Sequence, residues 1–442
     1  MKISIFGLGY VGVVSAACFA ELGNEVIGVD ISDYKVDTVN NKESPIAEQG
    51  LSELIAKQVE QGRLIATKDY KKAVLETDVS FICVGTPPKD SGDLDLSILE
   101  RVCSQIGSVL QEKENHIIVI RSTIFPGSFE KLKKILEESS GKIYGKNFNL
   151  ITNPEFLREG TAVKDFFEPP VIVIGSENEI IAQKVLEFYK DISSQKFIVE
   201  PSVAQMIKYV SNSFHALKIS FTNEISRICK KLNINDKKLM EIFCADSQLN
   251  ISPYYMKPGF AYGGSCLPKD TAALKNNAQK LGVRIPIIDS IEESNFEHIN
   301  EAIKLIKSQN KKRIGFLGIA FKKNTDDIRG NPLLLVINTL LNEGFNIKIW
   351  DKIVKKENIS RLNKSYRKEI FNLVIRRDLK QKIEDLSSLI TDKEETLNQD
   401  VIIISTRDKS LKQELQNLSS EKIIIDLQNL FEPKDFSVKY KV

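Results

Sequence analysis

One cysteine of this chain stands in surroundings that suit nucleophilic chemistry. Cys266 follows a glycine pair at 263–264 and precedes Lys269 and Asp270 within four positions. A cation near a thiol favours the thiolate, which is the nucleophilic form. An isolated cysteine is more often a small buried hydrophobe, so the motif alone favours a structural role. Together with a nicotinamide cofactor, however, a reactive cysteine would oxidise an aldehyde through a thioester.

The N-terminus carries the pattern of a dinucleotide site. Residues 2–6 are typical of a strand, the glycine loop 7–12 follows, 13–22 have a helical pattern, and a second strand ends in Asp30. The glycines let the backbone approach a pyrophosphate at a helix N-terminus. Asp30 would bind a ribose 2′-hydroxyl and repel a 2′-phosphate, which favours NAD over NADP. The residues expected at the cofactor are Gly7, Gly9, Tyr10, Val11, Gly12, Asp30 and Lys35.

Composition narrows the class of protein. The chain has 442 residues, which is enough for two or three domains. Its net charge is only +3, so the charge gives no indication of binding to nucleic acid or to membranes. No apolar run is long and glycine-free enough for a membrane span. Six scattered cysteines and three histidines show no disulfide or metal spacing, which indicates a reduced, cytoplasmic protein without a metal. The cysteines expected in the core are Cys18, Cys83 and Cys103.

The elements that must position these residues alternate between strands and helices. After the glycine loop the sequence predicts strands at 79–84, 116–121, 148–152 and 171–174, with helical patterns between most of them. This indicates an α/β, doubly wound, Rossmann-like domain over 1–200.

A long helix and a second α/β unit follow. From Pro201 the apolar residues keep a helical period for about 28 residues, which suits a spine between domains and a subunit interface. Strands then recur at 313–317, 347–351, 401–405 and 422–426. We therefore expect two Rossmann-like domains joined by a long central helix, with an exposed, charge-rich stretch at 352–400. The expected boundaries are 1–200 for the NAD-binding domain, 201–300 for a helical dimerisation domain and 311–442 for a domain that would bind the nucleotide end of a substrate.

The long helix carries a polar stripe. Lys208, Asn212, His215 and Asn223 recur at spacings of one or two turns, with Ile219 among them. Such a stripe is commonly a solvated helix face. In an oxidoreductase, a lysine and an asparagine one turn apart can hold a substrate hydroxyl and its developing oxyanion.

Three loops should meet at the carboxyl edge of the first sheet, where ligands bind in such folds. Glu155 follows the strand at 148–152 and is a candidate base, although a surface acid is the ordinary reading. Thr123 and Thr86 end two other strands at the same edge.

Other dehydrogenase types fit less well. No tyrosine has a lysine four residues later, which excludes the short-chain pattern, and the histidines lack an obvious aspartate partner. A one-step 3-hydroxyacid dehydrogenase shares the lysine-and-asparagine helix but does not need the cysteine. A binding protein without turnover is a third alternative, which a complete set of catalytic residue types disfavours.

These motifs together resemble the UDP-glucose/GDP-mannose dehydrogenase family over nearly the whole chain. The segments that carry the resemblance are GLGYVG (7–12), ICVGTP (82–87), RSTIFPG (121–127), NPEFLREG (153–160), KYVSNSFHALKISFTNEI (208–225), GGSCLPKD (263–270) and GFLGIAFKKNTDDIR (315–329).

The resemblance implies a four-electron oxidation of a sugar CH2OH to a carboxylate with two NAD reduced. Lys208 and Asn212 would hold the C6 oxygen, Cys266 would attack the aldehyde, and Asp270, Thr123 and Glu155 would position or activate water. It also implies further cofactor contacts from Thr86, Thr123, Glu159, Lys269 and Arg329. The implied substrate contacts are Glu155, Phe156, Leu157, Arg158, Lys208, Asn212, His215, Asn223, Tyr254, Tyr255, Lys257, Phe260, Gly263, Cys266, Phe321 and Lys322.

Within the family, SPIAEQGL (44–51) and YYMKPGFAYGGSC (254–266) are similar to the branch that oxidises GDP-mannose. UDP-glucose and UDP-N-acetylmannosamine are the alternative substrates, and a homodimer is expected. The chain departs from the family pattern at Lys257, where an arginine is usual, and at Gly330 and Asn331, where Glu-Ser is common.

Overall fold

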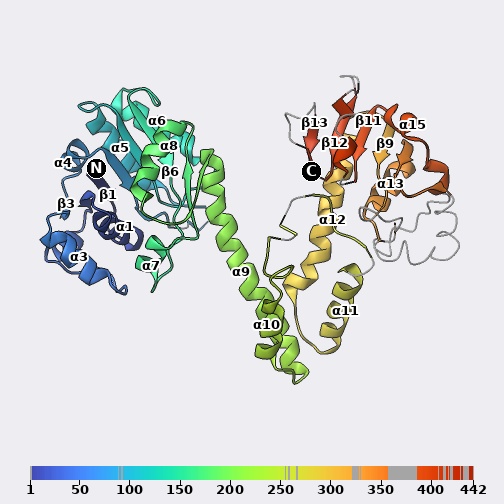
Figure 1. Cartoon of the computed structure of the whole chain (residues 1–442), viewed down its shortest axis with the longest axis horizontal. Helices are drawn as coiled ribbons and strands as arrows, with labels where there is room; N and C mark the ends of the chain where they lie inside the picture. The colour runs from blue at the N-terminus through green and yellow to red at the C-terminus, as the bar shows by residue number, and fades with distance from the viewer. Residues whose placement is uncertain are drawn as a thin grey trace. The chain divides into compact units, whose positions relative to one another are not determined.

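The computed structural model describes residues 2–441 apart from 88, 91–92, 254, 257–258, 265–266, 321–327, 329, 357–385, 407, 412–414, 417, 419–421, 429 and 432–437. The chain forms two compact units, Met1–Ala216 and Leu217–Val442, each with its own sheet (Figure 1). This confirms the predicted pair of Rossmann-like folds. No helix among the described residues is both long enough and apolar enough to cross a membrane.

Unit 1 contains an eight-stranded sheet in the order β3-β2-β1-β4-β5-β6-β7-β8. The first six strands are parallel, and β7 pairs antiparallel with β6 through Thr152 and Gly175. The order reverses between β1 and β4, and in folds of this kind ligands bind at the carboxyl edge at such a point. The strands are β1 (Lys2–Phe6), β2 (Glu25–Val29), β3 (Leu64–Thr67), β4 (Val79–Ile82), β5 (His116–Ile120), β6 (Phe148–Thr152), β7 (Val171–Gly175) and β8 (Gln195–Val199).

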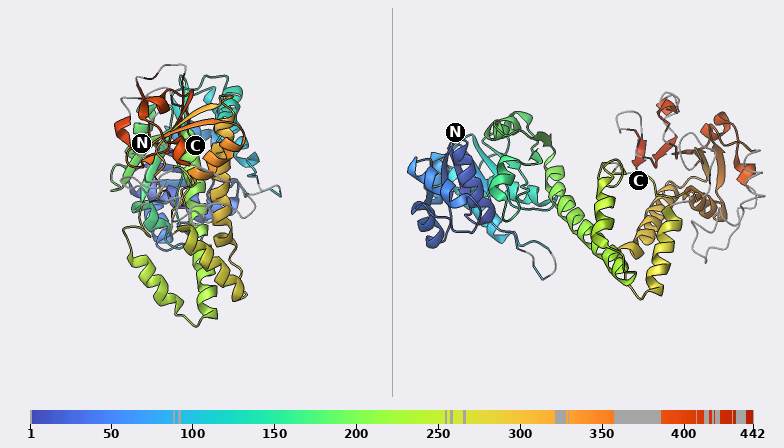
Figure 2. Two further views of the ribbon diagram at one scale, coloured as in Figure 1. Left: turned by 90° about the vertical axis from the view of Figure 1, so that its right-hand side faces the viewer. Right: turned by 60° about the horizontal axis from the view of Figure 1, so that its bottom comes forward.

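Helices cover both faces of this sheet (Figure 2). Alternate side chains of β1 show the two faces, because Ile3 and Ile5 enter one buried cluster and Phe6 enters another. Strands buried on both sides have the near-continuous apolar runs that made them predictable. The helices are α1 (Tyr10–Glu21), α2 (Asp33–Asn40), α3 (Leu51–Glu60), α4 (Tyr70–Glu76), α5 (Ser97–Leu110), α6 (Ser128–Ser140), α7 (Ala162–Phe167) and α8 (Glu179–Leu186).

Helix α9 (Pro201–Lys231) begins in unit 1 and ends in unit 2. Pro201 suits its first turn because proline has a preset φ and no N–H to leave unpaired. Within unit 2, Glu224 of α9 accepts hydrogen bonds from the N–H groups of Ile287 and Ile288 (2.9 and 3.2 Å), which satisfies the start of α12. The helices of this part are α10 (Asp236–Ala245), α11 (Leu267–Lys280) and α12 (Pro286–Lys307).

The sheet of unit 2 has five parallel strands in the order β10-β9-β11-β12-β13. Its core joins α12 and α13 to the sheet. Asp351, directly after β10, accepts hydrogen bonds from the N–H groups of Ile319 and Ala320 (2.8 and 3.0 Å). The elements are β9 (Arg313–Leu317), α13 (Leu333–Asn342), β10 (Asn346–Trp350), α15 (Lys393–Leu397), β11 (Val401–Ile404), β12 (Ile423–Asp426) and β13 (Val438–Lys441).

The structure adds elements that the sequence pattern did not reveal. Strands β3, β8 and β13 are short and partly polar, so their apolar signal is weak. Much of the predicted charge-rich stretch at 352–400 lies outside the described residues. Cys18, Cys83 and Cys103 are buried as predicted.

Candidate active site at the carboxyl edge of the first sheet

The glycine loop between β1 and α1 is closed at its ends and open at its centre. A Cβ atom on Gly12 would lie 1.7 Å from the carbonyl oxygen of Gly7, so this position accepts only glycine. A Cβ on Gly9 would have no described atom within 4 Å. The loop therefore has open space at Gly9, directly before the first turn of α1, as a phosphate group at a helix N-terminus requires.

Asp30 lies directly after β2 as an ionised, well-held acid. Its carboxylate accepts hydrogen bonds from the N–H groups of Leu8 (2.7 Å) and Ser32 (3.0 Å) and pairs with the Lys35 ammonium (2.9 Å). Burial alone would raise the pKa of Asp30, but these hydrogen bonds outweigh it and lower that pKa. The loop and the acid therefore fit NAD. Lys35, expected at a cofactor oxygen, contacts Asp30 here.

Glu48 ties the cofactor loop to the loop after β6. It accepts hydrogen bonds from the Tyr10 hydroxyl and from the N–H groups of Gly160 (2.8 Å) and Ala162 (3.0 Å) at the start of α7. Burial and this contact raise the pKa of Tyr10. Sequence reasoning missed this role of Glu48, although the residue lies in the SPIAEQGL segment; only the fold brings residues 48 and 160 together.

The loops after β4 and β5 are also joined. The Thr86 hydroxyl donates to the carbonyl of Thr123 (2.9 Å), and the Ser122 hydroxyl donates to the carbonyl of Val84 (2.6 Å). Two residues predicted for the site, Thr86 and Thr123, therefore lie together at the carboxyl edge.

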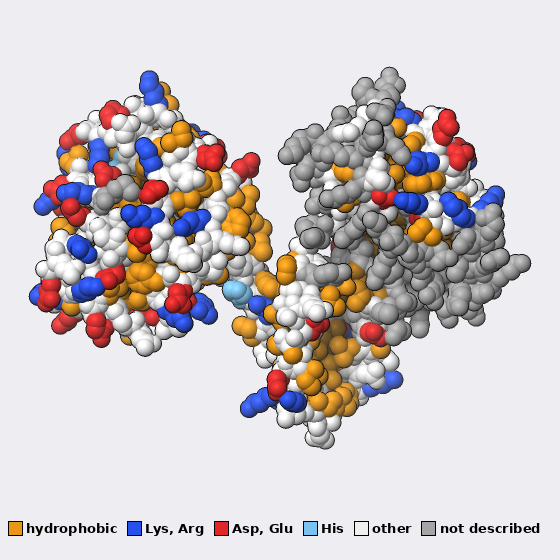
Figure 3. Space-filling model, viewed as in Figure 1, with side chains coloured by type: hydrophobic (Ala, Val, Ile, Leu, Met, Phe, Trp, Pro, Cys, Tyr) orange, Lys and Arg blue, Asp and Glu red, His pale blue; other side chains and the backbone are white. Residues whose placement is uncertain are grey.

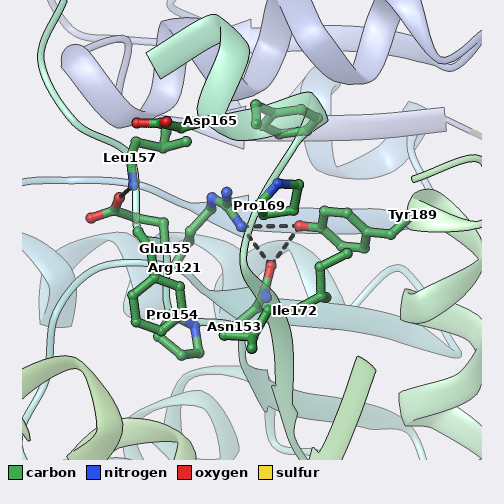
Figure 4. A pocket seen from close by; sticks show the side chains of 12 residues that line it. Arg121, Asn153, Pro154, Glu155, Leu157, Asp165, Pro169, Ile172 and Tyr189 are labelled. Carbon is green, nitrogen blue, oxygen red and sulfur yellow. Dashed lines mark hydrogen bonds between the residues drawn. The ribbon is translucent and has the colours of Figure 1, made fainter. Parts of the chain in front are cut away.

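A buried cation anchors the turn that carries Glu155 (Figure 4). Nη1 of Arg121, after β5, donates to the side-chain oxygen of Asn153 (2.7 Å) and to the Tyr189 hydroxyl (3.0 Å). Asn153 also donates to the carbonyl of Val173 (2.9 Å). Arg121, Asn153 and Tyr189 line a cavity of ≈ 30 Å³. From the sequence, Arg121 was noted only as part of the RSTIFPG segment, and its role at this turn was missed. Its position could have indicated the role, because a charged residue directly after a buried strand is unusual.

Lys208 and Glu155 form the chemical centre of the edge. The Lys208 ammonium donates to the Glu155 carboxylate (2.8 Å) and to its backbone carbonyl (2.6 Å), and the two side chains are only 13% and 10% exposed. The N–H of Leu157 donates to the other carboxylate oxygen (2.6 Å). In so sheltered a place an ammonium can stabilise an oxyanion, and a carboxylate can take up a proton.

Three predicted catalytic residues thus share one wall, because Thr123, Glu155 and Lys208 line a common cavity. The other predicted residues of unit 1 are more dispersed. Arg158 is held by Asp165 through bonds of 2.6 and 3.0 Å while its side chain stays mostly exposed. The Lys208 ammonium lies 5.6 Å from the Phe156 ring centroid. Glu159 and, further along α9, Asn212 and His215 are exposed.

In unit 2 the glycine pair before Cys266 packs on the segment that departs from the family pattern. The N–H of Gly264 donates to the carbonyl of Gly330 (3.0 Å), and a Cβ on Gly263 would lie 2.2 Å from the same oxygen. Asn331 donates to the carbonyl of Ile319 (2.9 Å) and accepts from the N–H of Leu333 (2.9 Å). Gly330 and Asn331 therefore have structural roles of their own.

The remaining residues of unit 2 can be placed only in part. Asn223 is exposed on α9, Tyr255 is exposed with a φ of +63°, Phe260 packs on the unit 2 core, and Asp270 is exposed in the first turn of α11. Outside the described residues or side chains lie Cys266, Lys269, Tyr254, Lys257, Phe321, Lys322 and Arg329.

The glycine loop, the ionised Asp30 and the Lys208–Glu155 pair at one sheet edge define the class of protein: an NAD-dependent oxidoreductase. The chain belongs to the UDP-glucose/GDP-mannose dehydrogenase family. It matches that family's NAD binding domain over residues 1–193, its central domain over 202–297 and its UDP binding domain over 315–433. The protein is accordingly a dehydrogenase of nucleotide sugars.

Relatives cover nearly the whole chain. It is 42% identical to GDP-mannose 6-dehydrogenase of Pseudomonas aeruginosa, over 97% of this chain and 96% of that protein. It is 33% identical to a UDP-glucose 6-dehydrogenase of Bacillus subtilis, over 97% and 89%. A solved ternary complex of the Pseudomonas aeruginosa GDP-mannose dehydrogenase superposes with a TM-score of 0.90 at 41% identity, covering 98% of this chain and 97% of that one.

Proposed function

We propose that this protein oxidises C6 of GDP-mannose to the carboxylate of GDP-mannuronate. The observation that carries the proposal is the sheltered Lys208–Glu155 pair beside Thr123, at the edge where the glycine loop receives NAD. The choice of sugar nucleotide follows the relative with 42% identity, which is a GDP-mannose 6-dehydrogenase. UDP-glucose and UDP-N-acetylmannosamine are the competing substrates.

In the first oxidation, Lys208 and Asn212 hold the C6 oxygen. The C6 hydroxyl loses its proton, and the C6 carbon loses one hydride. Lys208 acts through its positive charge, since an ammonium in a poorly solvated site stabilises the alkoxide that forms before hydride loss. NAD, when bound, accepts the hydride in each of the two oxidations. Gly7, Gly9, Gly12 and Asp30 would hold it, with Tyr10, Val11, Thr86 and Thr123 nearby.

In the second oxidation, the Cys266 thiolate adds to the aldehyde carbon and forms a thiohemiacetal. Loss of a second hydride from the same carbon gives a thioester, and water then releases the carboxylate and the thiol. Thr123, Glu155 and Asp270 position this water or take up its proton. Covalent capture explains why the aldehyde would not escape between the two steps.

We also propose a three-domain organisation at 1–200, 201–300 and 311–442, a homodimer, and a cytoplasmic location. The dimer is supported by exposed apolar side chains on α9, among them Val203, Val210 and Leu217. Scattered cysteines support a reducing compartment.

The test is NADH release by the purified protein with NAD and each of GDP-mannose, UDP-glucose and UDP-N-acetylmannosamine. We expect the highest kcat/KM with GDP-mannose and two NADH per sugar. Faster turnover of a UDP-sugar would refute the substrate and leave the mechanism. One NADH per substrate would refute the thioester route, as would a Cys266→Ala variant that still produces the sugar acid.

A further inference from the structure

A small cavity lies behind the Lys208–Glu155 pair, between the end of β5, the turn after β6 and the first turns of α9. Its volume is ≈ 10 Å³, which is about the room that one water molecule needs. Its walls include Thr123, Pro154, Glu155, Ala204, Gln205 and Lys208.

Among the residues that line this cavity, Gln205 has a buried polar side chain whose hydrogen bonds are not accounted for. Its side chain is only 4% exposed, and neither its amide nitrogen nor its amide oxygen has a hydrogen-bond partner among the described residues. A side-chain amide can donate two hydrogen bonds and accept two. Buried polar groups in folded proteins are nearly always satisfied, by ordered water where no protein group is in reach. Gln205 precedes Lys208 by three residues, so both point from one face of α9.

The other walls supply what a bound water would need. Such a water makes about three hydrogen bonds, and the residues that line the same space include Thr123, Glu155 and Lys208, which carry a hydroxyl, a carboxylate and an ammonium. Arg121 lines it too, and its buried Nε has no partner among the described residues. Polar and charged residues therefore form part of a largely apolar lining, and the cavity adjoins the residues assigned to the sugar C6.

We propose that Gln205 holds a water molecule in this cavity and positions it for hydrolysis of the acyl-enzyme. The inference rests on the proposed function, because only a thioester route has an acyl-enzyme that water must hydrolyse. The water oxygen bonds to the thioester carbon, one water proton passes to the Glu155 carboxylate, and the carbon–sulfur bond breaks to release the thiolate. Gln205 touches the water and not the sugar, so it is a positioning residue.

The experiment compares Gln205→Met with the wild-type protein. Methionine keeps the length of the side chain and removes both hydrogen-bonding groups. Because a misplaced reactant can slow a step about 100-fold, we expect hydrolysis to become rate-limiting. A rapid burst of two NADH per active site should then precede slow turnover, and acid-quenched protein should carry the mass of the acyl group. KM should fall together with kcat, so that kcat/KM for the sugar nucleotide hardly changes.

A matched control is Gln58→Met. Gln58 on α3 of the same unit is also fully buried, and its amide oxygen likewise has no partner among the described residues. It lies outside the cavity, so its replacement should lower thermal stability without a burst or an acyl adduct. Gln205→Glu, which retains a group able to bind water, should restore hydrolysis.

Hydroxylamine provides an independent readout. As an external nucleophile it attacks the thioester directly and yields a hydroxamate, so it should restore turnover of Gln205→Met. Wild-type kcat in this variant, or a slow kcat without acyl-enzyme and without rescue, would overturn the inference. If Gln205→Met does not fold, Gln205→Asn, which withdraws the amide by one methylene, is judged by the same criteria. Absence of sugar oxidation by the wild-type protein would instead refute the proposed function.

Discussion

At the scale of single residues, the Lys208–Glu155 pair is largely buried, and an unpaired charge at this place would destabilise the fold. Both side chains are largely buried, and their bond of 2.8 Å joins α9 to the turn after β6. The same pair therefore contributes to stability and to the proposed chemistry. Its two roles can be separated by replacing each partner alone and both together.

We predict that Lys208→Met destabilises the protein by about 3 kcal/mol, because it leaves a buried carboxylate without its cation. The double variant Lys208→Met/Glu155→Gln should lose less stability than the single one, since no buried charge remains. Thermal unfolding midpoints measure the difference, and NADH release should be lost in both. Equal midpoints for the single variant and the wild type would contradict the prediction.

At the scale of elements, the two units fix the loop after their first strand through the same kind of hydrogen bond. The acid after the second strand of each sheet, Asp30 or Asp351, accepts hydrogen bonds from the loop that follows the first strand, β1 or β9. In unit 2 that loop is further joined through Asn331, and Gly330 meets the glycine pair before Cys266. Close backbone contact of this kind leaves no room for a side chain.

We predict that Gly330→Ala is more damaging than Gly344→Ala. Both glycines have positive φ, +62° and +75°, so either alanine is strained by about 1–2 kcal/mol. At Gly330 the new Cβ would also lie 2.5 Å from the carbonyl oxygen of Gly264, whereas at Gly344 it would meet no described atom within 4 Å. Thermal midpoints and kcat of the two variants test this, and equal losses would count against the contact.

The sheet of unit 1 contains a buried polar chain that should respond to pH. His116 of β5 shares a hydrogen bond of 2.7 Å with Ser80 of β4, and Ser80 shares another of 2.7 Å with Ser4 of β1. Burial, reinforced by the nearby Lys113, lowers the pKa of His116 to about 3. The folded protein therefore keeps this histidine neutral.

We predict that His116 makes stability fall as the pH is lowered. The unfolded chain binds a proton near pH 6.5 and the folded chain only near 3, so between these values unfolding takes up a proton and is favoured by acid, by about 1.4 kcal/mol per pH unit. His116→Gln should be less stable than the wild type at pH 8, and the gap in thermal midpoint should close toward pH 5. A gap that is constant with pH would refute this.

At the scale of the whole molecule, apolar side chains remain exposed on the helical segments. Val203, Val210 and Leu217 recur every seven residues along α9 and are each about half exposed. A seven-residue repeat keeps side chains on one face, as at helix–helix interfaces. Figure 3 shows further hydrophobic side chains gathered over the helical part of unit 2, where Ile242 and Phe243 of α10 are also exposed.

We predict that Val210→Arg weakens self-association. A charge at the centre of this face should lower the mass measured by light scattering from that of a dimer toward that of the 49.9 kDa chain. Ser202→Arg adds the same charge at another exposed position of α9 and should leave the mass unchanged. A Val210→Arg protein that keeps the wild-type mass would place the interface elsewhere.

The sequence alone determined the cofactor loop, the positions of most strands along the chain and the long helix. These depend on local patterns: Gly7 to Gly12, the acid at Asp30, and apolar runs such as those of β1 and β4, which are legible because their strands are buried on both faces. It also singled out Glu155 and Thr123, since residues that follow parallel strands must meet at one edge, and it singled out Lys208 from the polar stripe on the long helix.

Only the tertiary structure decided which of these side chains touch. Three of these contacts join positions far apart in the chain: Glu155 with Lys208, Glu48 with Gly160, and Arg121 with Asn153. A further feature, the Gln205 amide without a hydrogen-bond partner among the described residues, depends on burial. No local periodicity encodes such contacts. They follow from how strands and helices pack, which brings distant residues into one poorly solvated space and leaves each polar group to be satisfied there.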